Sequence, residues 1–263
     1  MEIKEYLKPK SIEEAYEALL SNINNKIIGG GAWIKISLKK VDTLISLDDL
    51  KLNYIKEEND FFEIGSMTPL RDLEINKGLN DLAGGIISKA IGNIMGVSIR
   101  NIATIGGSVM GKFAFSDLLG VLMVLDAELI FYNSGVISVE DFINMPKIPK
   151  DILLSIRLKK QTAKGYFKKV ATTHLDFSIL NLAIVYNERF KIAIGSRPNI
   201  AVLAKRTEEY LNGFKKLDEA NLDEVVKISL EEVKLGDNSR GSKEYRELLM
   251  KTYLKRGIRE VIK

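Results

Sequence analysis

The stretch TIGGSVMGK, at residues 104–112, places two adjacent glycines directly after a run of apolar and β-branched residues. A second stretch, IGGGAWIK, at residues 28–35, has three glycines in the same setting much earlier in the chain. Because glycine lacks a Cβ atom, glycines in series mark backbone that bends sharply or lies close to a bulky group. Two such stretches indicate either two ordinary turns or two walls of one binding site.

Three schemes of phosphate binding can be compared with these glycines. The Rossmann pattern needs G-x-G-x-x-G, and the first stretch lacks the third glycine. The P-loop pattern fits residues 106–112 but then fails, because Phe113 replaces the hydroxyl residue that holds Mg²⁺. In the third scheme, two glycine-rich turns point backbone N–H groups at one pyrophosphate. The sequence therefore favours a dinucleotide between the two stretches, where a side chain at Gly107 is expected to block the phosphate.

The composition excludes several classes of function. The 263 residues are 46% hydrophobic and 28% charged with a net charge of +4, which is typical of a globular protein and does not indicate nucleic-acid binding. With no cysteine and one histidine, His174, the chain has no thiolate or histidine cluster for a metal. No catalytic residue and no metal ligand are predicted. The N-terminal residues contain no signal segment and no apolar run spans a bilayer, so a cytoplasmic location is expected.

Alternating strand and helix patterns predict an α+β fold. Ser11 and Glu14 form a capping box before a helix, and the glycine pair within residues 81–91 predicts a break in another. Residues 151–160 and 165–171 are predicted to be strands that face each other. The last hundred residues are predicted to form an antiparallel sheet covered by helices, with a domain boundary near residues 161–165.

Several longer segments occur in a characteristic order along the whole chain: IIGGGAWIKISLKK, EIGSMTPLRDLE, SIRNIATIGGSVMGKFAFSDLLGVLMVLDAEL and LGDNSRGSKEYRELLMKTYLKR. Together they resemble the FAD-binding medium subunit of the molybdenum hydroxylases, the family of the xanthine dehydrogenase and carbon monoxide dehydrogenase medium chains. The most specific piece combines an arginine, the TIGG turn and a following aspartate. The resemblance implies a two-lobed FAD-binding domain of the vanillyl-alcohol-oxidase (PCMH) type over 1–162, with lobes near 1–53 and 54–162. A small C-terminal α/β domain with an antiparallel sheet is implied over 163–263.

The resemblance also implies which residues bind FAD. Lys169 would lie toward the isoalloxazine ring, with the neighbouring Lys168 as the alternative register. Asp117 would face the adenosine side, Leu153 would pack on the flavin, and Ile94 would lie on the flavin side as well. The full implied set is Gly29, Gly30, Gly31, Ala32, Trp33, Ile94, Thr104, Ile105, Gly106, Gly107, Ser108, Asp117, Leu153 and Lys169.

The glycine stretches depart from the usual sequence of this family. Ala32 and Trp33 stand where the family has a polar pair, and Ser108 stands where it has asparagine. These changes remove side-chain donors and leave every backbone donor in place. Plain structural roles also fit some of the residues: a tight turn for the first stretch, packing for Trp33, a helix N-terminal acid for Asp117, and a solvated strand edge for Lys169.

The function implied by the resemblance is electron transfer. Such a subunit would pass electrons from a small [2Fe-2S] subunit through FAD to NAD⁺, a quinone, oxygen or another acceptor. A large molybdopterin-binding subunit would oxidise the substrate, so this chain would be a flavoprotein oxidoreductase subunit and not the hydroxylating one. The alternative is a degenerate subunit of the same type of complex that has lost FAD and serves in assembly or structure.

Overall fold

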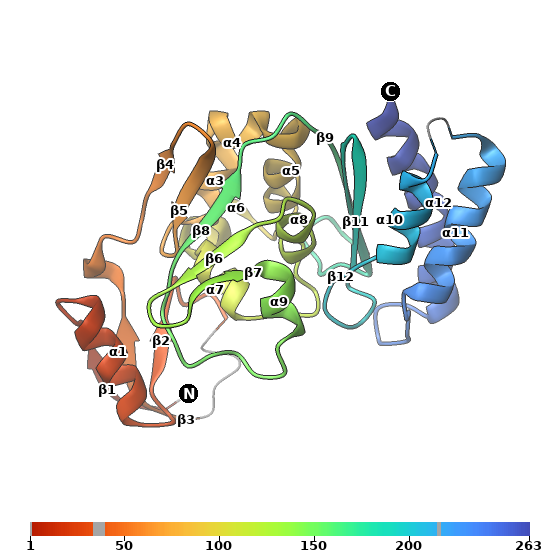
Figure 1. Ribbon diagram of the computed structural model, residues 1–263. Coiled ribbons are helices and arrows are strands. Elements are labelled where there is room, and N and C mark those ends of the chain that lie inside the picture. Colours follow the sequence, from red (N-terminus) through yellow and green to blue (C-terminus); the bar gives the residue numbers. More distant parts are fainter. Residues whose placement is uncertain (1, 34–39, 215–216) are drawn as a thin grey trace. The chain divides into compact units, whose positions relative to one another are not determined.

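The structure is a computed structural model that describes residues 2–33, 40–214 and 217–263 (Figure 1). The chain forms two compact units, each built from three chain segments. Unit 1 contains Met1–Leu73, Gly96–Gly111 and Ala127–Lys159, and unit 2 contains Glu74–Met95, Lys112–Asp126 and Lys160–Lys263. Both units mix helices with sheets, so the predicted α+β class is confirmed. The continuous domains expected over 1–162 and 163–263 stay a prediction beside these discontinuous units.

Unit 1 begins with a small parallel sheet in the order β1-β3-β2. Its strands, with the elements that follow them, are β1 (Glu2–Leu7), α1 (Ile12–Ser21), β2 (Lys26–Ile28), β3 (Lys40–Ser46) and the 3₁₀ turn η1 (Asp48–Leu50). Helix α1 begins at Ser11, whose side chain accepts from the backbone N–H of Glu14, as the capping box predicts. Its buried face, Ala15 and Leu19, packs in one apolar cluster with Ile45. Strand β2 leads directly into the first glycine stretch.

The second sheet of unit 1 has five antiparallel strands in the order β4-β5-β8-β6-β7. These strands are β4 (Ile55–Glu57), β5 (Phe61–Gly65), β6 (Glu128–Phe131), β7 (Gly135–Ser138) and β8 (Leu153–Lys159). Strand β8 is the central strand, and most of its residues are buried because it has a neighbour on each side. The prediction that this strand faces residues 165–171 is wrong, since β8 pairs with β5 and β6 instead.

Short helices connect the sheets. In unit 1 they are α6 (Val97–Ile102), α7 (Ile105–Met110) and α9 (Val139–Asn144), and α3 (Leu70–Ile75) begins there. In unit 2 they are α4 (Lys77–Asp81), η2 (Leu82–Gly85), α5 (Ile86–Gly92) and α8 (Leu119–Val124). The predicted break at the glycine pair is confirmed, because Gly84 and Gly85 have φ angles of +64° and +75° and separate α4 from α5.

Unit 2 contains an antiparallel sheet in the order β12-β11-β10-β9, as predicted for the last hundred residues. Its elements are β9 (Lys164–Val170), β10 (Leu180–Asn187), β11 (Arg189–Gly195), β12 (Val202–Leu203), α10 (Lys205–Asn212), α11 (Glu219–Glu232) and α12 (Lys243–Ile262) (Figure 1). On one face, Ile184 and Ile192 join an apolar cluster with residues of these three helices. Ala193 lies on the opposite face, where Gly120 of α8 comes close to it.

Candidate functional site

The two glycine stretches touch each other in unit 1. A Cβ atom added to Gly29 would lie 2.6 Å from the Oγ1 atom of Thr104. One added to Gly30 would lie only 1.3 Å from the carbonyl oxygen of Ile102. These distances leave no room for a side chain, so close approach of the backbones requires glycine here. The two stretches are thus side by side, in the arrangement expected of two walls of one site.

The second stretch contains the whole of helix α7, and the amides of the first turn of this helix are paired within the chain. Thr104 is the N-cap, and its Oγ1 atom accepts from the N–H of Gly107 at 3.1 Å. The N–H of Ile105 donates to Thr68 at 3.0 Å, that of Gly106 donates to Ser66 at 2.9 Å, and that of Ser108 donates to the Thr104 carbonyl at 3.0 Å. These amides are used within the chain, and their role toward a phosphate stays a prediction. Gly107 is exposed, so a ligand has access to its backbone.

The first stretch has backbone donors that are not used by the described residues. Within the described part of the chain, the N–H groups of Gly30, Gly31 and Ala32 donate no hydrogen bond. Gly31 has a φ angle of +71°, which places it in the left-handed region. Successive amides around such a residue suit the binding of an anion, and no side chain of Gly30 or Gly31 covers them. These residues fit the pyrophosphate of a dinucleotide.

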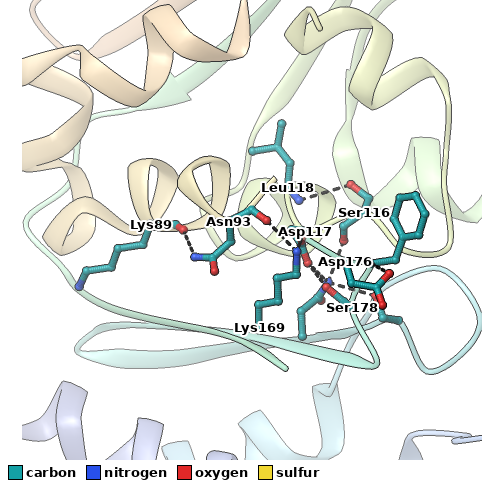
Figure 2. A network of polar contacts seen from close by, with 11 residues as sticks. Lys89, Asn93, Ser116, Asp117, Leu118, Lys169, Asp176 and Ser178 are labelled. Carbon is teal, nitrogen blue, oxygen red and sulfur yellow. Dashed lines mark hydrogen bonds and ion pairs between the residues drawn. The ribbon is translucent and has the colours of Figure 1, made fainter. Parts of the chain in front are cut away.

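In unit 2, Asp117 and Lys169 form a buried ion pair (Figure 2). The Nζ atom of Lys169 lies 3.4 Å from Oδ2 of Asp117, and the two side chains are 5% and 6% exposed. The same ammonium donates to the carbonyl oxygen of Asn93 at 2.7 Å, at the C-terminal end of α5. An ammonium has three N–H donors, and these are its two acceptors among the described residues.

Asp117 is held by two further donors. Its Oδ1 atom accepts from the hydroxyl of Ser178 and, at 2.8 Å, from the side-chain amide of Asn181. Burial raises the pKa of Asp117, while the Lys169 ammonium and these hydrogen bonds oppose that rise. Sequence reasoning did not identify Ser178, Asn181 or Asn93 as site residues. The signal for Asn181 was a polar residue inside the apolar run ILNLAIV, which predicts a buried strand.

The ion pair bears on two roles that the resemblance implied. Asp117 was expected at the adenosine side of FAD and Lys169 at the isoalloxazine ring, and the pyrophosphate and ribityl chain separate these two groups. Their side chains are in contact. Asp117 therefore holds Lys169 directly, and the roles of the two residues toward FAD stay predictions. The neighbouring Lys168 lies over the ring of Tyr253, and the choice between the two registers stays a prediction as well.

The remaining predicted residues are distributed between the units. Leu153 is the first residue of β8 in unit 1 and is only 3% exposed. Trp33 is partly buried beside the first glycine stretch. Ile94 follows α5 in unit 2, and its N–H donates to the carbonyl oxygen of Ile91 at 2.8 Å. The described ranges contain no group of three or more His, Cys, Asp or Glu residues that could hold a metal, and none of their helices is long and apolar enough to cross a membrane.

Comparison with known proteins identifies the family. Residues 1–159 match the model described as FAD binding domain in molybdopterin dehydrogenase, and residues 165–261 match the CO dehydrogenase flavoprotein C-terminal domain. Because the first match spans more than half of the chain, this protein belongs to the family of FAD-binding subunits of molybdenum hydroxylases. It is therefore a flavoprotein subunit of the oxidoreductase class, and FAD is its cofactor.

Individual relatives cover nearly the full length. The chain is 26% identical over 276 residues to the glyceraldehyde dehydrogenase medium chain of Sulfolobus acidocaldarius, with 97% of each chain covered. It is 23% identical over 281 residues to the xanthine dehydrogenase FAD-binding subunit of Escherichia coli O157:H7, with 98% of this chain and 95% of the relative covered. The fold is similar to that of a chain of the reconstituted CO dehydrogenase from Oligotropha carboxidovorans, with a TM-score of 0.89, 22% identity, and coverage of 99% and 98%.

Proposed function

We propose that this protein is the electron-transfer subunit of a multi-subunit molybdenum-containing dehydrogenase. Bound FAD supplies the redox chemistry, taking electrons from iron–sulfur clusters of a small partner subunit and delivering them to an external acceptor. The observation that carries the proposal is the contact between the two glycine stretches, with Gly29 against Thr104, beside N–H groups of Gly30, Gly31 and Ala32 that have no acceptor among the described residues. Substrate oxidation is assigned to a large molybdopterin-binding partner, so this chain needs no general base or nucleophile.

The residues of the chain contribute binding and electrostatics. In unit 1, the amides of Gly30, Gly31 and Ala32 bind the pyrophosphate, and the bare backbone at Gly107 lets it come close. In unit 2, Lys169 is the residue that the resemblance assigns to the flavin, and the Asn93 carbonyl and Asp117 fix its ammonium. A fixed cation near the ring favours the more negative, reduced form of the cofactor. The buried position of Lys169 strengthens this effect, because the charge is shielded less by water.

A titration with two flavins tests the proposal. The purified chain, freed of flavin, is titrated with FAD and with FMN, and binding is followed by quenching of flavin fluorescence. FAD should bind more tightly than FMN, because only FAD contains the pyrophosphate that the first glycine stretch fits. Equal or tighter binding of FMN would contradict the assignment of this stretch to the pyrophosphate.

A second candidate function is an assembly subunit that binds no FAD. Two observations favour it: the amides of the second stretch are used within the chain, and Ala32 offers no polar side chain. This candidate predicts that the purified complex has no flavin absorption band at about 450 nm, and that protein mixed with FAD and then freed of unbound FAD has none either. Binding of FAD in the titration above would exclude it.

A further inference from the structure

Arg246, at the start of α12, is a buried cation whose acceptors are neutral oxygens. The residue has no exposed surface. Its Nε atom donates to the carbonyl oxygens of Ile179 and Ser196 at 2.9 and 3.3 Å. The rest of the guanidinium donates to the carbonyls of Gly236 and Gly241 and, at 2.6 Å, to the side-chain oxygen of Asn238. Burial lowers the pKa of Arg246, as expected for a charge removed from water.

This arrangement is a costly way to fill space. A guanidinium loses several kcal/mol of hydration on burial, and carbonyl dipoles return less than a carboxylate would. An apolar side chain of similar volume would pack the base of α12 without that loss. What the guanidinium does, and an apolar side chain cannot, is hold several separate backbone segments in one fixed geometry through its planar set of donors.

One of those segments contacts Asp117 directly, and another contacts Asn181, which binds Asp117. Ile179 lies between Ser178, whose hydroxyl donates to Asp117, and the strand that carries Asn181. The amide of Asn181 donates to Asp117 at 2.8 Å, to the Ser116 carbonyl at 3.0 Å and to the Ser196 hydroxyl at 3.3 Å. Arg246 thus fixes the backbone on both sides of the Asn181 amide, and that amide fixes the carboxylate.

Gly195 completes this arrangement. A Cβ atom at Gly195 would lie 2.2 Å from the side-chain oxygen of Asn181, on the residue directly opposite in the antiparallel pair. A side chain there would push the amide out of place. Strand β11 therefore has a glycine directly opposite Asn181, the residue that binds Asp117. The φ angle of Gly195 is not positive, so its backbone conformation does not require glycine.

We infer that Asn181 and Arg246 are positioning residues that hold the Asp117–Lys169 pair in the geometry needed at the flavin. Arg246 aligns the segments that contain Ile179 and Ser196, Asn181 binds the Asp117 carboxylate, and Asp117 binds the Lys169 ammonium. The inference rests on the proposed function in one respect, namely that Lys169 faces the cofactor. It gives α12 and the loop before it a role in cofactor binding, at a distance from any residue that touches FAD.

The main test is Asn181→Asp in the full chain. This change keeps the shape of the side chain but places a second carboxylate against Asp117, in a site where Lys169 is the facing cation. Two carboxylates in contact cannot both ionise readily, so one takes up a proton at mildly acid pH and then donates as the amide did. We expect the Kd for FAD to rise about tenfold near pH 8 and to return to within about twofold of wild type near pH 5.5. The midpoint potential of the bound flavin should shift over the same pH range.

The matched control is Thr207→Val, which breaks another buried polar contact in unit 2. The Thr207 hydroxyl lies 2.8 Å from that of Ser229, and both residues are fully buried. This variant should lose stability but keep the wild-type Kd for FAD at every pH. If Asn181→Asp likewise changes only stability, with no pH-dependent change in affinity or potential, the role of Asn181 is overturned.

Arg246→Lys tests the role of Arg246, because it keeps the positive charge and loses the planar set of guanidinium donors. We expect the Kd for FAD to rise about fivefold or more. Circular dichroism should show that the variant is folded. If this variant does not fold, Asn238→Ala removes one acceptor of Arg246 on an exposed loop, and a rise of about threefold is expected instead. If the variant that folds, either Arg246→Lys or Asn238→Ala, binds FAD with the wild-type Kd, the role of Arg246 is overturned.

A measurement without FAD separates this inference from the proposed function. In the apoprotein near pH 8, Asn181→Asp should lower the melting temperature, and adding Asp117→Asn should restore it because one carboxylate then remains. If the wild-type protein binds no FAD, the proposed function fails. The effect of Asp117→Asn on the melting temperature of Asn181→Asp still decides whether Asn181 positions Asp117. Absence of the coupling would overturn the inference whatever the cofactor.

Discussion

At the residue scale, Gly30 is a position where a neighbouring backbone leaves no room for a side chain. An alanine Cβ would lie 1.3 Å from the Ile102 carbonyl oxygen, so one of the two backbones must move. We expect Gly30→Ala to lower the free energy of unfolding by about 1–3 kcal/mol and to abolish FAD binding, as measured by urea unfolding and flavin titration. Gly135→Ala is the control, because Gly135 has a positive φ angle but open space around it. The Gly135→Ala variant should lose a little stability and bind FAD normally. Normal FAD binding by Gly30→Ala would show that the contact at Gly30 is not needed for cofactor binding.

Gly107 provides a contrast at the same scale. It is helical and exposed, and a Cβ there would lie 3.1 Å from Thr104 Oγ1. Alanine favours a helix, so Gly107→Ala should leave the free energy of unfolding within about 1 kcal/mol of wild type. The added methyl group covers the backbone that the phosphate approaches, and we expect the Kd for FAD to rise about tenfold. An unchanged Kd with an intact fold would show that the phosphate does not approach Gly107.

At the scale of elements, strands β5 and β8 are linked by a polar contact that responds to pH. Glu63 and Arg157 are directly opposite in the antiparallel pair, 3.0 Å apart, and Tyr54 donates to Glu63 at 2.9 Å. Burial alone would raise the pKa of Glu63, but the contacts with Arg157 and Tyr54 outweigh it and lower that pKa below 4.5. Because the folded pKa is the lower one, the stabilisation is present above the unfolded value and is lost as the pH falls through the folded value.

Glu63→Gln should therefore lower the free energy of unfolding by about 1 kcal/mol near neutral pH. The difference from wild type should shrink toward zero as the pH falls below the lowered pKa, in urea unfolding curves measured from neutral to acid pH. Glu58→Gln, at an exposed carboxylate in the turn between β4 and β5, is the control. A deficit in Glu63→Gln that stays constant across the pH range would mean that the amide has disturbed packing and that the charge is unimportant.

The sequence predicted elements with strong local signals and missed those decided by distant partners. The N-cap at Ser11, the break at Gly84 and the antiparallel sheet of the last hundred residues were all predictable, since each depends on neighbours in the chain. The reciprocal half of the capping box at Ser11 is absent, because the Glu14 carboxylate accepts from the N–H of Lys10 instead. The pairing of β8 was not, because an apolar run shows that a strand is buried but not which strands flank it. The contact of Asp117 with Lys169 joins residues far apart in sequence, and no periodicity or spacing specifies such a pair.

At the scale of the whole molecule, the proposed function makes this chain one step in a longer electron path. It has no cysteine and one histidine, so it does not supply the ligands of an iron–sulfur cluster that could feed its flavin. Its full-length relatives include one named as a medium chain and one named as a FAD-binding subunit. We infer that the protein works in a complex with a small [2Fe-2S] subunit and a large molybdopterin-binding subunit.

We predict that purification from the native organism recovers both partners with this chain, through interfaces that each bury on the order of 1,000 Å² or more. The isolated chain, loaded with FAD, should pass electrons from a reduced nicotinamide to artificial dyes slowly, because dyes and nicotinamides reach a flavin without a partner. It should oxidise no purine, aldehyde or carbon monoxide, since these reactions need the molybdenum centre of the large subunit.

Adding the two partners back should restore substrate-dependent dye reduction. Gly30→Ala in the reassembled complex should remove electron delivery to the flavin's acceptor. Gel filtration should show that the complex with this variant still assembles. Substrate-dependent dye reduction by this chain alone would overturn the electron-transfer role, because it would require a substrate-oxidising centre within the chain itself.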